Sequence, residues 1–208
     1  MSQPHMVQKF KNDKQMKALL FNGSPRENGN TACLLSQMVD LFRQNGAETE
    51  FIQLGGQKIH GCTACMSCKD NKDEKCVYDD DPINDYIQKM KHADAIIIAS
   101  PVYFSQMTPE TKALIDRCGY TIRANGEILS RKIGAGIAVA RRSGTMPTLH
   151  SINDFFFIND MIVPGSNYWN VGVAKEPGEV KDDKEGIKVV RRLAENILWL
   201  HSKIASAE

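Results

Sequence analysis

Long apolar runs are missing from this sequence of 208 residues. No window approaches the roughly 20 apolar residues that a membrane-spanning helix needs, and the opening residues, Met1 to Met6, lack the apolar core of a secretory signal. We therefore expect a cytosolic protein that does not bind a membrane. In that reducing compartment, cysteines are expected as thiols, metal ligands or redox groups and not as structural disulfides.

A large charge of either sign is also missing. The 26 Lys and Arg residues balance the 25 Asp and Glu residues, which leaves a formal net charge of +1. No global field therefore favours nucleic acid or another polyanion as a partner. With 42% hydrophobic and 25% charged residues, the chain has the composition of one globular domain with a single core.

The familiar nucleotide motifs are missing as well. The chain contains neither GxGxxG nor GxxxxGK[ST], which argues against a Rossmann dinucleotide site and against a triphosphate P-loop. No catalytic triad stands out in the sequence either. That absence fits a reaction whose chemistry belongs to a bound cofactor.

The most informative segment that is present runs from Asn22 to Thr31 and reads NGSPRENGNT. It lies between the apolar run Ala18 to Phe21 and a helical segment from Ala32, where the unpaired N–H groups of a helix N-terminus attract an anion. The segment predicts a cradle for a monophosphate. The alternative is a solvated turn that caps the helix. The residues that can approach the ligand, donate hydrogen bonds or supply charge are Gly23, Ser24, Arg26, Gly29, Asn30 and Thr31.

Around this segment, short β-rich runs alternate with amphipathic helical windows. Five strands interleaved with helices predict a parallel sheet with helices on both faces. Residues 1–16 are polar and are expected to form an N-terminal arm, residues 17–208 the domain, and residues at about 55–81 a cysteine-bearing insert. The expected strands are Lys17–Asn22, Glu48–Gln53, Ala93–Ala99, Ile133–Ala140 and one around Val163–Val173. The expected helices are Thr31–Asn45, Pro82–Lys91, Met107–Cys118, Met146–Asn159 and Lys184–Ile204.

A second loop, from Ser100 to Met107, directly follows the most apolar strand. In a parallel sheet it reaches the same edge as the first loop, which is where FMN binds in the flavodoxin-like arrangement. Pro101 fixes the turn, and Tyr103 and Phe104 offer flat apolar surface for a planar ring. The backbone N–H groups of this loop could bond the polar edge of that ring. The alternative is that the two aromatics fill the core beneath the next helix.

A third loop, from Ala140 to Thr145, follows the fourth strand in the corresponding place. Its serine, glycine and threonine can approach a ligand through backbone and hydroxyl groups. Arg141 and Arg142 could stabilise a reduced flavin or meet the phosphate of a nicotinamide cofactor. They could equally be solvated surface arginines.

Four cysteines gather in the insert. Cys62, Cys65 and Cys68 form a CxxCxxC run, and Cys76 follows after seven intervening residues. Zinc sites more often use two separated CxxC pairs, whereas consecutive runs are typical of iron–sulfur clusters. The bacterial ferredoxin pattern has an earlier fourth cysteine followed by proline, but here Val77 follows. A [4Fe–4S] cluster, redox-active or unligated thiols, and zinc are the three alternatives. The other two cysteines fall in helical windows and are expected to pack as small apolar groups: Cys33 and Cys118.

Three motifs in this order resemble the NAD(P)H-dependent FMN reductase group of flavodoxin-like proteins. They are GSPRENGNT at 23–31, the CxxCxxC insert with Cys76 and the run Asp79–Asp81, and Ser100-Pro-Val-Tyr103. The insert is most similar to that of the iron–sulfur flavoprotein branch. The resemblance covers residues 17–145 well and the rest by alternation of strands and helices. It implies an α/β flavodoxin-like three-layer sandwich whose five parallel strands have the order 2-1-3-4-5, with the insert after strand 2.

The resemblance also implies a set of ligands. FMN would be bound non-covalently, and a neighbouring subunit of a homodimer or homotetramer would help to cover it. The implied FMN-binding residues are Ser24, Arg26, Asn30, Thr31 and Ala32 at the phosphate, Pro101, Val102, Tyr103 and Phe104 at the ring, and Ser143, Gly144 and Thr145 nearby. The implied ligands of a [4Fe–4S] cluster are Cys62, Cys65, Cys68 and Cys76.

The function that follows is an FMN-dependent oxidoreductase. NAD(P)H would deliver a hydride to flavin N5, or ferredoxin would donate electrons if a cluster is present. The acceptor would be a small molecule such as a quinone, an azo or nitro compound, a flavin or dioxygen. The alternatives are a flavodoxin-like electron carrier without its own substrate, or a redox or metal sensor based on the thiols.

Overall fold

A five-stranded parallel sheet forms the centre of the computed structural model, which describes residues 14–206. The strand order is β2-β1-β3-β4-β5, so the predicted flavodoxin-like topology is confirmed. The expected arm at 1–16 lies mainly outside the described residues. The strands are β1 Lys17–Asn22, β2 Glu48–Gln53, β3 Ala95–Pro101, β4 Ile133–Ala140 and β5 Val171–Val173. The helices are α1 Asn30–Gln44, α2 Ser67–Asn71, α3 Ile83–His92, α4 Pro109–Ala124, α5 Thr145–Ile158, the 3-10 helix η1 Glu179–Asp182 and α6 Lys184–Ala205.

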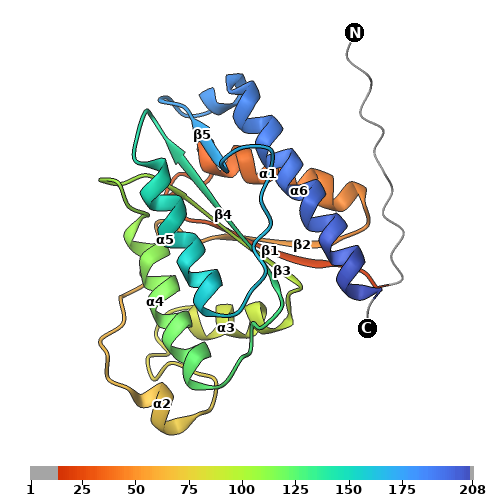
Figure 1. Ribbon diagram of the computed structural model, residues 1–208. Helices are drawn as coiled ribbons and strands as arrows, with labels where there is room; N and C mark the ends of the chain where they lie inside the picture. The colour runs from red at the N-terminus through yellow and green to blue at the C-terminus, as the bar shows by residue number, and fades with distance from the viewer. Residues whose placement is uncertain (1–13, 207–208) are drawn as a thin grey trace.

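Helices cover both faces of the sheet (Figure 1). Side chains of β1 alternate between two apolar clusters, with Leu20 toward α1 and α6 on one face and Phe21 toward α3, α4 and α5 on the other. In β3 the whole run from Ala95 to Ser100 is buried. A strand buried on both faces reads as a continuous apolar run because right-handed crossovers place helices over each side.

The last strand is much shorter than expected. The sequence predicts a strand around 163–173, but β5 contains only Val171–Val173. Before it, Ile162 makes an isolated bridge to Ile133, and Val171 pairs with Ala138. Between these two points β4 advances by five residues and the facing segment by nine, so the facing segment must bulge away from the sheet. Pro164, which has no N–H to donate, falls within this segment.

The segment between β2 and α3 carries the cysteines and lies beside α4, below the sheet in the view of Figure 1. It is irregular, as expected, except for the short helix α2, which packs on α4. Helix α4 is longer than expected, since it continues past Gly119 to Ala124. This extra length provides the surface on which the insert rests. Among the described residues, no helix is both long and apolar enough to cross a bilayer.

Candidate functional site

The loop after β1 is held in place by hydrogen bonds from three directions. Gly23 N–H donates to Ala99 O over 2.7 Å, and the buried Thr108 hydroxyl donates to Gly23 O over 2.8 Å. Gln53 Nε2 donates to Ser24 O over 2.7 Å. A Cβ on Gly23 would lie 2.1 Å from Thr111 Oγ1. The loop is therefore fixed before any ligand arrives, and only glycine fits where it leaves the strand.

This loop leads into the N-terminus of α1. No side chain caps that end, and the first turn contains no acidic residue, so the positive end of the helix dipole is not neutralised locally. Thr31 and Ala32 are buried in the first turn, and the buried Ser24 hydroxyl accepts a hydrogen bond from Arg26 N–H. Arg26 itself is exposed. The arrangement is that of an anion site made of backbone N–H groups and hydroxyls.

Asn30, one of the predicted phosphate ligands, faces a different segment. Its Nδ2 donates to Glu176 O over 2.9 Å, and its Oδ1 accepts from Val180 N–H over 3.2 Å. The carboxamide thus ties α1 to the segment that precedes α6. We expect Asn30 to position the helix N-terminus and not to hold the phosphate through its side chain.

The loop after β3 forms a tight turn at the same edge. Tyr103 and Gln106 exchange backbone hydrogen bonds of 2.8 and 3.0 Å, and the two central residues, Phe104 and Ser105, have positive φ angles of 48° and 62°, as in a type I′ turn. The Phe104 side chain is 104% exposed, so the alternative that it fills the core is wrong. The N–H groups of Val102 and Tyr103 are already bonded within the protein, which leaves those of Phe104 and Ser105 as candidates for a ring edge.

The loop after β4 lies against this turn. Gly144 has a φ of 88°, and a Cβ there would lie 2.8 Å from Val102 Cγ1 and 3.1 Å from Ser105 Cα. Arg141, Arg142 and Ser143 are exposed, and Thr145 begins α5. The three loops, residues 23–29, 101–106 and 141–144, thus gather at the carboxyl edge of β1, β3 and β4, where doubly wound proteins bind ligands. We call this edge the rim.

The four cysteines of the insert line a single pocket against α4. Cys62, Cys65, Cys68 and Cys76 share it with Arg117, Tyr120 and Thr121 and with other residues of the insert. Among the described residues, no three of the four sulfurs lie within 4.8 Å of one another. A tetrahedral zinc site needs sulfurs about 3.8 Å apart, given a Zn–S distance of about 2.3 Å. The sulfurs are not at that spacing, and the observation that suits a cluster of several irons is that all four thiols line one pocket.

Backbone and side chains in the insert favour bound thiolates. Ala64 and Met66 have positive φ angles of 53° and 64°, and such alternation turns successive N–H groups toward an anion. Ala64 N–H donates to Cys62 Sγ over 3.4 Å. Hydrogen bonds from Ser67 lower the pKa of the Cys65 thiol, whereas burial raises the pKa of Cys68. A bound metal would overcome the second effect, because metals bind the deprotonated thiol.

The other two cysteines lie outside this pocket. Cys118 is fully buried in the core, and burial raises its pKa strongly, so it stays a neutral thiol. Cys33 is half-buried on α1, on the opposite face of the sheet. Both positions agree with the expectation that these two residues pack as small apolar groups.

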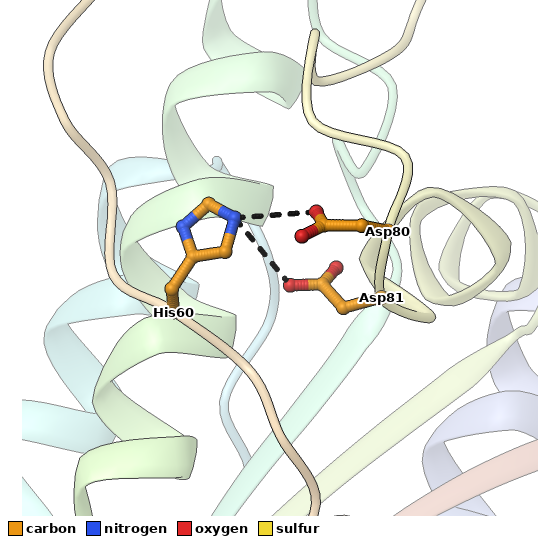
Figure 2. Close-up of side chains that lie close together, drawn as sticks. All are labelled: His60, Asp80 and Asp81. Atoms are coloured by element: carbon orange, nitrogen blue, oxygen red, sulfur yellow. Dashed lines mark ion pairs between the residues drawn. The ribbon is translucent and has the colours of Figure 1, made fainter.

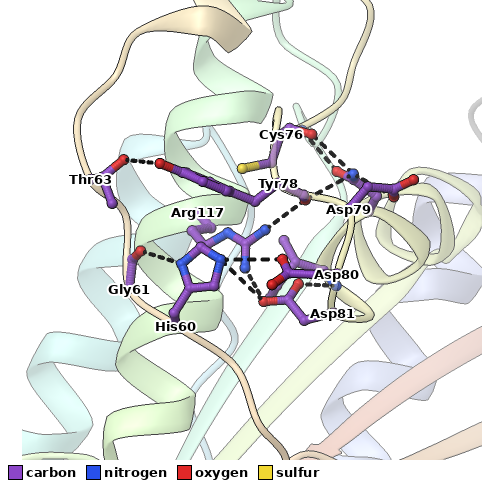
Figure 3. A network of polar contacts seen from close by, with 11 residues as sticks. His60, Gly61, Thr63, Cys76, Tyr78, Asp79, Asp80, Asp81 and Arg117 are labelled. Atoms are coloured by element: carbon purple, nitrogen blue, oxygen red, sulfur yellow. Dashed lines mark hydrogen bonds and ion pairs between the residues drawn. The ribbon is translucent and has the colours of Figure 1, made fainter.

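A second polar cluster borders the cysteine pocket. His60 Nε2 lies 3.5 Å from Asp80 and 3.9 Å from Asp81 (Figure 2). This is the one tight group of three potential metal ligands within residues 14–206. However, Asp81 already forms an ion pair with the buried Arg117 (Figure 3). A metal cation at this place would face a guanidinium, so the group is an ion-pair network and not a cation site.

Sequence reasoning missed several residues that build these sites. Thr108 and Gln53 hold the first loop, and Arg117 and Thr121 line the cysteine pocket. Arg117 had a visible signal, since it falls on the apolar stripe of α4, next to Cys118. A charged residue on such a stripe is rare unless it is paired. The hydrogen bonds of Thr108 and Gln53 depend on long-range contacts and have no local signal.

Helix α4 connects the two sites. It begins at the rim, where its N-cap residue Thr108 bonds to Gly23, and it carries Arg117 at the cysteine pocket. From Pro109 to Arg117 the helix rises about 12 Å. The rim and the pocket are therefore close but separate places on one subunit.

Comparisons with known proteins agree with this geometry. A family model described as NADPH-dependent FMN reductase matches residues 16–176. An iron–sulfur flavoprotein of Methanocaldococcus jannaschii is 38% identical over 189 residues, covering 88% of this chain and 95% of that protein. An iron–sulfur flavoprotein of Methanosarcina thermophila is 33% identical, covering 88% of this chain and 93% of the relative. The solved NAD(P)H:quinone oxidoreductase from Methanothermobacter marburgensis has a TM-score of 0.67 at 13% identity, covering 88% of this chain and 96% of that one, and shares the fold.

Proposed function

The chain belongs to the NADPH-dependent FMN reductase family and to its iron–sulfur flavoprotein branch, and from this premise we propose that it passes electrons from NAD(P)H to a small acceptor through FMN held at the rim. The acceptor is a quinone, an azo or nitro compound, a free flavin or dioxygen. The observation that carries the proposal is the meeting of three loops at one sheet edge, with an uncapped and unneutralised helix N-terminus among them.

The protein's part in this chemistry is to bind and orient. The first-turn N–H groups of α1 at Thr31 and Ala32, with the Ser24 hydroxyl, would hold the phosphate, and Arg26 would supply charge. The turn around Phe104 would lie against the ring. FMN, when bound, supplies the hydride chemistry at its own ring, so no protein acid, base or nucleophile is required for that step.

The four cysteines of the insert would hold a [4Fe–4S] cluster, which supplies one-electron chemistry. The single pocket that all four cysteines line and the turned backbone at Ala64 and Met66 support this assignment. A groove beside Cys68 is lined by Lys69, Lys72 and Arg123. Such a cationic lining would suit an acidic electron-donor protein such as ferredoxin, which is the second candidate donor.

Anaerobic steady-state turnover tests the proposed reaction. We expect protein loaded with FMN to oxidise NADH or NADPH continuously when a benzoquinone or a nitroaromatic compound is supplied, and to stop when the acceptor is exhausted. The control is free FMN at the same concentration, which sets the uncatalysed rate. If the protein binds FMN and accepts electrons from dithionite but turns over neither nicotinamide with any of the acceptors, NAD(P)H is not the donor and the proposed reaction is wrong.

Replacing Arg26 and Thr31 together by alanine tests the position of the phosphate. The change removes the compensating charge and a first-turn hydroxyl, so we expect at least a tenfold weaker FMN affinity, or about 1.4 kcal/mol. Fluorescence titration of the apoprotein measures it. Riboflavin, which lacks the phosphate, is the matched control ligand and should bind wild type and variant equally. An unchanged affinity for FMN would contradict the assignment.

A further inference from the structure

Arg117 is a buried cation in the face of α4 that meets the cysteine insert. Its side chain is 0% exposed, and it is among the largest fully buried side chains of the described residues. The neighbouring positions on the same stripe, Leu114, Cys118 and Ile122, are apolar and belong to the core. Burying a guanidinium costs several kcal/mol unless it is paired and hydrogen-bonded, so the charge is expected to have a specific use.

The contacts of Arg117 all point to the insert (Figure 3). Its Nη1 forms an ion pair with the Asp81 carboxylate, which is itself 1% exposed. Its Nη2 donates to Tyr78 O over 3.0 Å, and its guanidinium carbon lies 5.9 Å from the centroid of the Tyr78 ring. The Cys76 thiol lines the same pocket as the guanidinium. Arg117 thus lines the pocket that all four cysteines line.

The hydrogen-bonding capacity of the side chain is not fully used by these contacts. The Asp81 carboxylate balances its charge, but its buried Nε has no hydrogen-bond partner within residues 14–206. An arginine guanidinium is not deprotonated in proteins. The residue therefore remains a cation. A spare buried donor on a permanent cation suits a pocket that is to hold several thiolates.

We propose that Arg117 is a positioning residue that sets the reduction potential of the group bound by the four cysteines, and that Asp81 opposes it. The inference rests on the proposed function, because it needs a redox group at these cysteines. One-electron reduction adds one negative charge there without moving a proton or breaking a bond. A buried cation in the lining of the cysteine pocket stabilises that added charge and raises the potential, whereas the nearby carboxylate lowers it.

Two single variants of opposite sign test this proposal. Arg117→Gln removes the cation, and we expect reduction to become at least tenfold less favourable, which is about 59 mV for one electron. Asp81→Asn removes the opposing anion and should shift the potential upward. The double variant should lie between the two single variants, and Arg117→Lys should stay nearer to wild type than Arg117→Gln. The measurement is an anaerobic redox titration with dithionite and mediators, followed by EPR, with iron and sulfide assayed on each sample.

If Arg117 and Asp81 only held the insert in place, their variants would give a different result. Both single variants would then lose iron or thermal stability together, and their potentials would not move in opposite directions. The matched control is Arg123→Gln on the same helix. Its side chain is exposed, so water screens its charge, and we expect a shift well below tenfold.

The outcomes of the redox titration distinguish the role of Arg117 from the cluster assignment. Potentials that stay unchanged or move in the same direction, in variants that retain iron, overturn the role of Arg117 and leave the proposed function intact. If Arg117→Gln does not retain iron, Asp81→Asn decides alone, and an unchanged or lowered potential there overturns the inference. If the wild-type protein holds no iron and sulfide after anaerobic reconstitution, the cluster assignment itself is wrong and the inference falls with it.

Discussion

Replacing Gly23 by alanine is expected to abolish retention of FMN and to destabilise the protein. The new methyl group would lie 2.1 Å from Thr111 Oγ1 and 2.8 Å from Ala99 O. Ala99 O belongs to the buried strand β3 and cannot move away without breaking the sheet. Overpacking of this kind costs about 3 kcal/mol, and the loop must shift outward, away from the N-terminus of α1. We therefore expect FMN affinity to fall at least a hundredfold, or about 2.7 kcal/mol.

Thermal unfolding of the apoprotein and FMN titration measure the two effects separately. A loss of about 3 kcal/mol corresponds to a fall in Tm of about 6–12 °C for a domain of this size. The matched control is Gly165→Ala, since a Cβ on Gly165 meets no atom within 4 Å and its φ is not in the left-handed region. That variant should bind FMN like wild type. A Gly23→Ala protein with normal stability and normal FMN affinity would show that this loop does not fix the phosphate site.

Replacing any one of the insert cysteines by serine is expected to remove the cluster. Loss of an outer-sphere partner alone typically weakens metal binding by about 10–100-fold, and loss of a thiolate ligand should cost more. We therefore expect bound iron and sulfide to fall by more than about tenfold, together with the broad absorbance beneath the flavin bands. FMN content should stay near the wild-type level, because the rim and the cysteine pocket are separate. The four variants are Cys62→Ser, Cys65→Ser, Cys68→Ser and Cys76→Ser.

The control variant is Cys33→Ser, which changes a half-buried thiol of α1 far from the insert. It should retain iron, sulfide and FMN. Metal analysis also separates the alternatives. Zinc without sulfide in the wild-type protein, or iron content that survives in all four cysteine variants, would contradict the cluster assignment.

The strands and their order were the most predictable part of the fold. β1, β2 and β4 have the predicted bounds. For β1 and β4 the reason is that buried parallel strands leave continuous apolar runs bounded by turn residues, whereas β2 is a mostly exposed edge strand. The segment around Val163–Val173 also contains valine and aromatic residues that favour strands, but only three of its residues, Val171–Val173, pair with β4. Strand length at a sheet edge depends on register with the neighbour, and a single sequence does not contain that information.

The candidate site likewise has a part that the sequence predicts and a part that depends on long-range contacts. The sequence predicts the three loops at the rim and the four cysteines as site residues because glycine, hydroxyl and thiol residues have narrow chemical uses. Asn30 shows the limit of this reasoning. Its amide suits a phosphate, but the structure turns it toward Glu176 and Val180, residues that lie 146 and 150 positions away in the chain. Contacts of such long range follow from the topology and not from local pattern.

The central claim is that the carboxyl edge of β1, β3 and β4 binds FMN with its phosphate at the N-terminus of α1. A crystal structure of the protein grown with saturating FMN tests it most directly. We predict the phosphate within hydrogen-bond distance of the backbone nitrogens of Thr31 and Ala32 and the isoalloxazine ring beside the turn Tyr103–Gln106. An empty rim under these conditions, or a flavin bound at another place, would contradict the account.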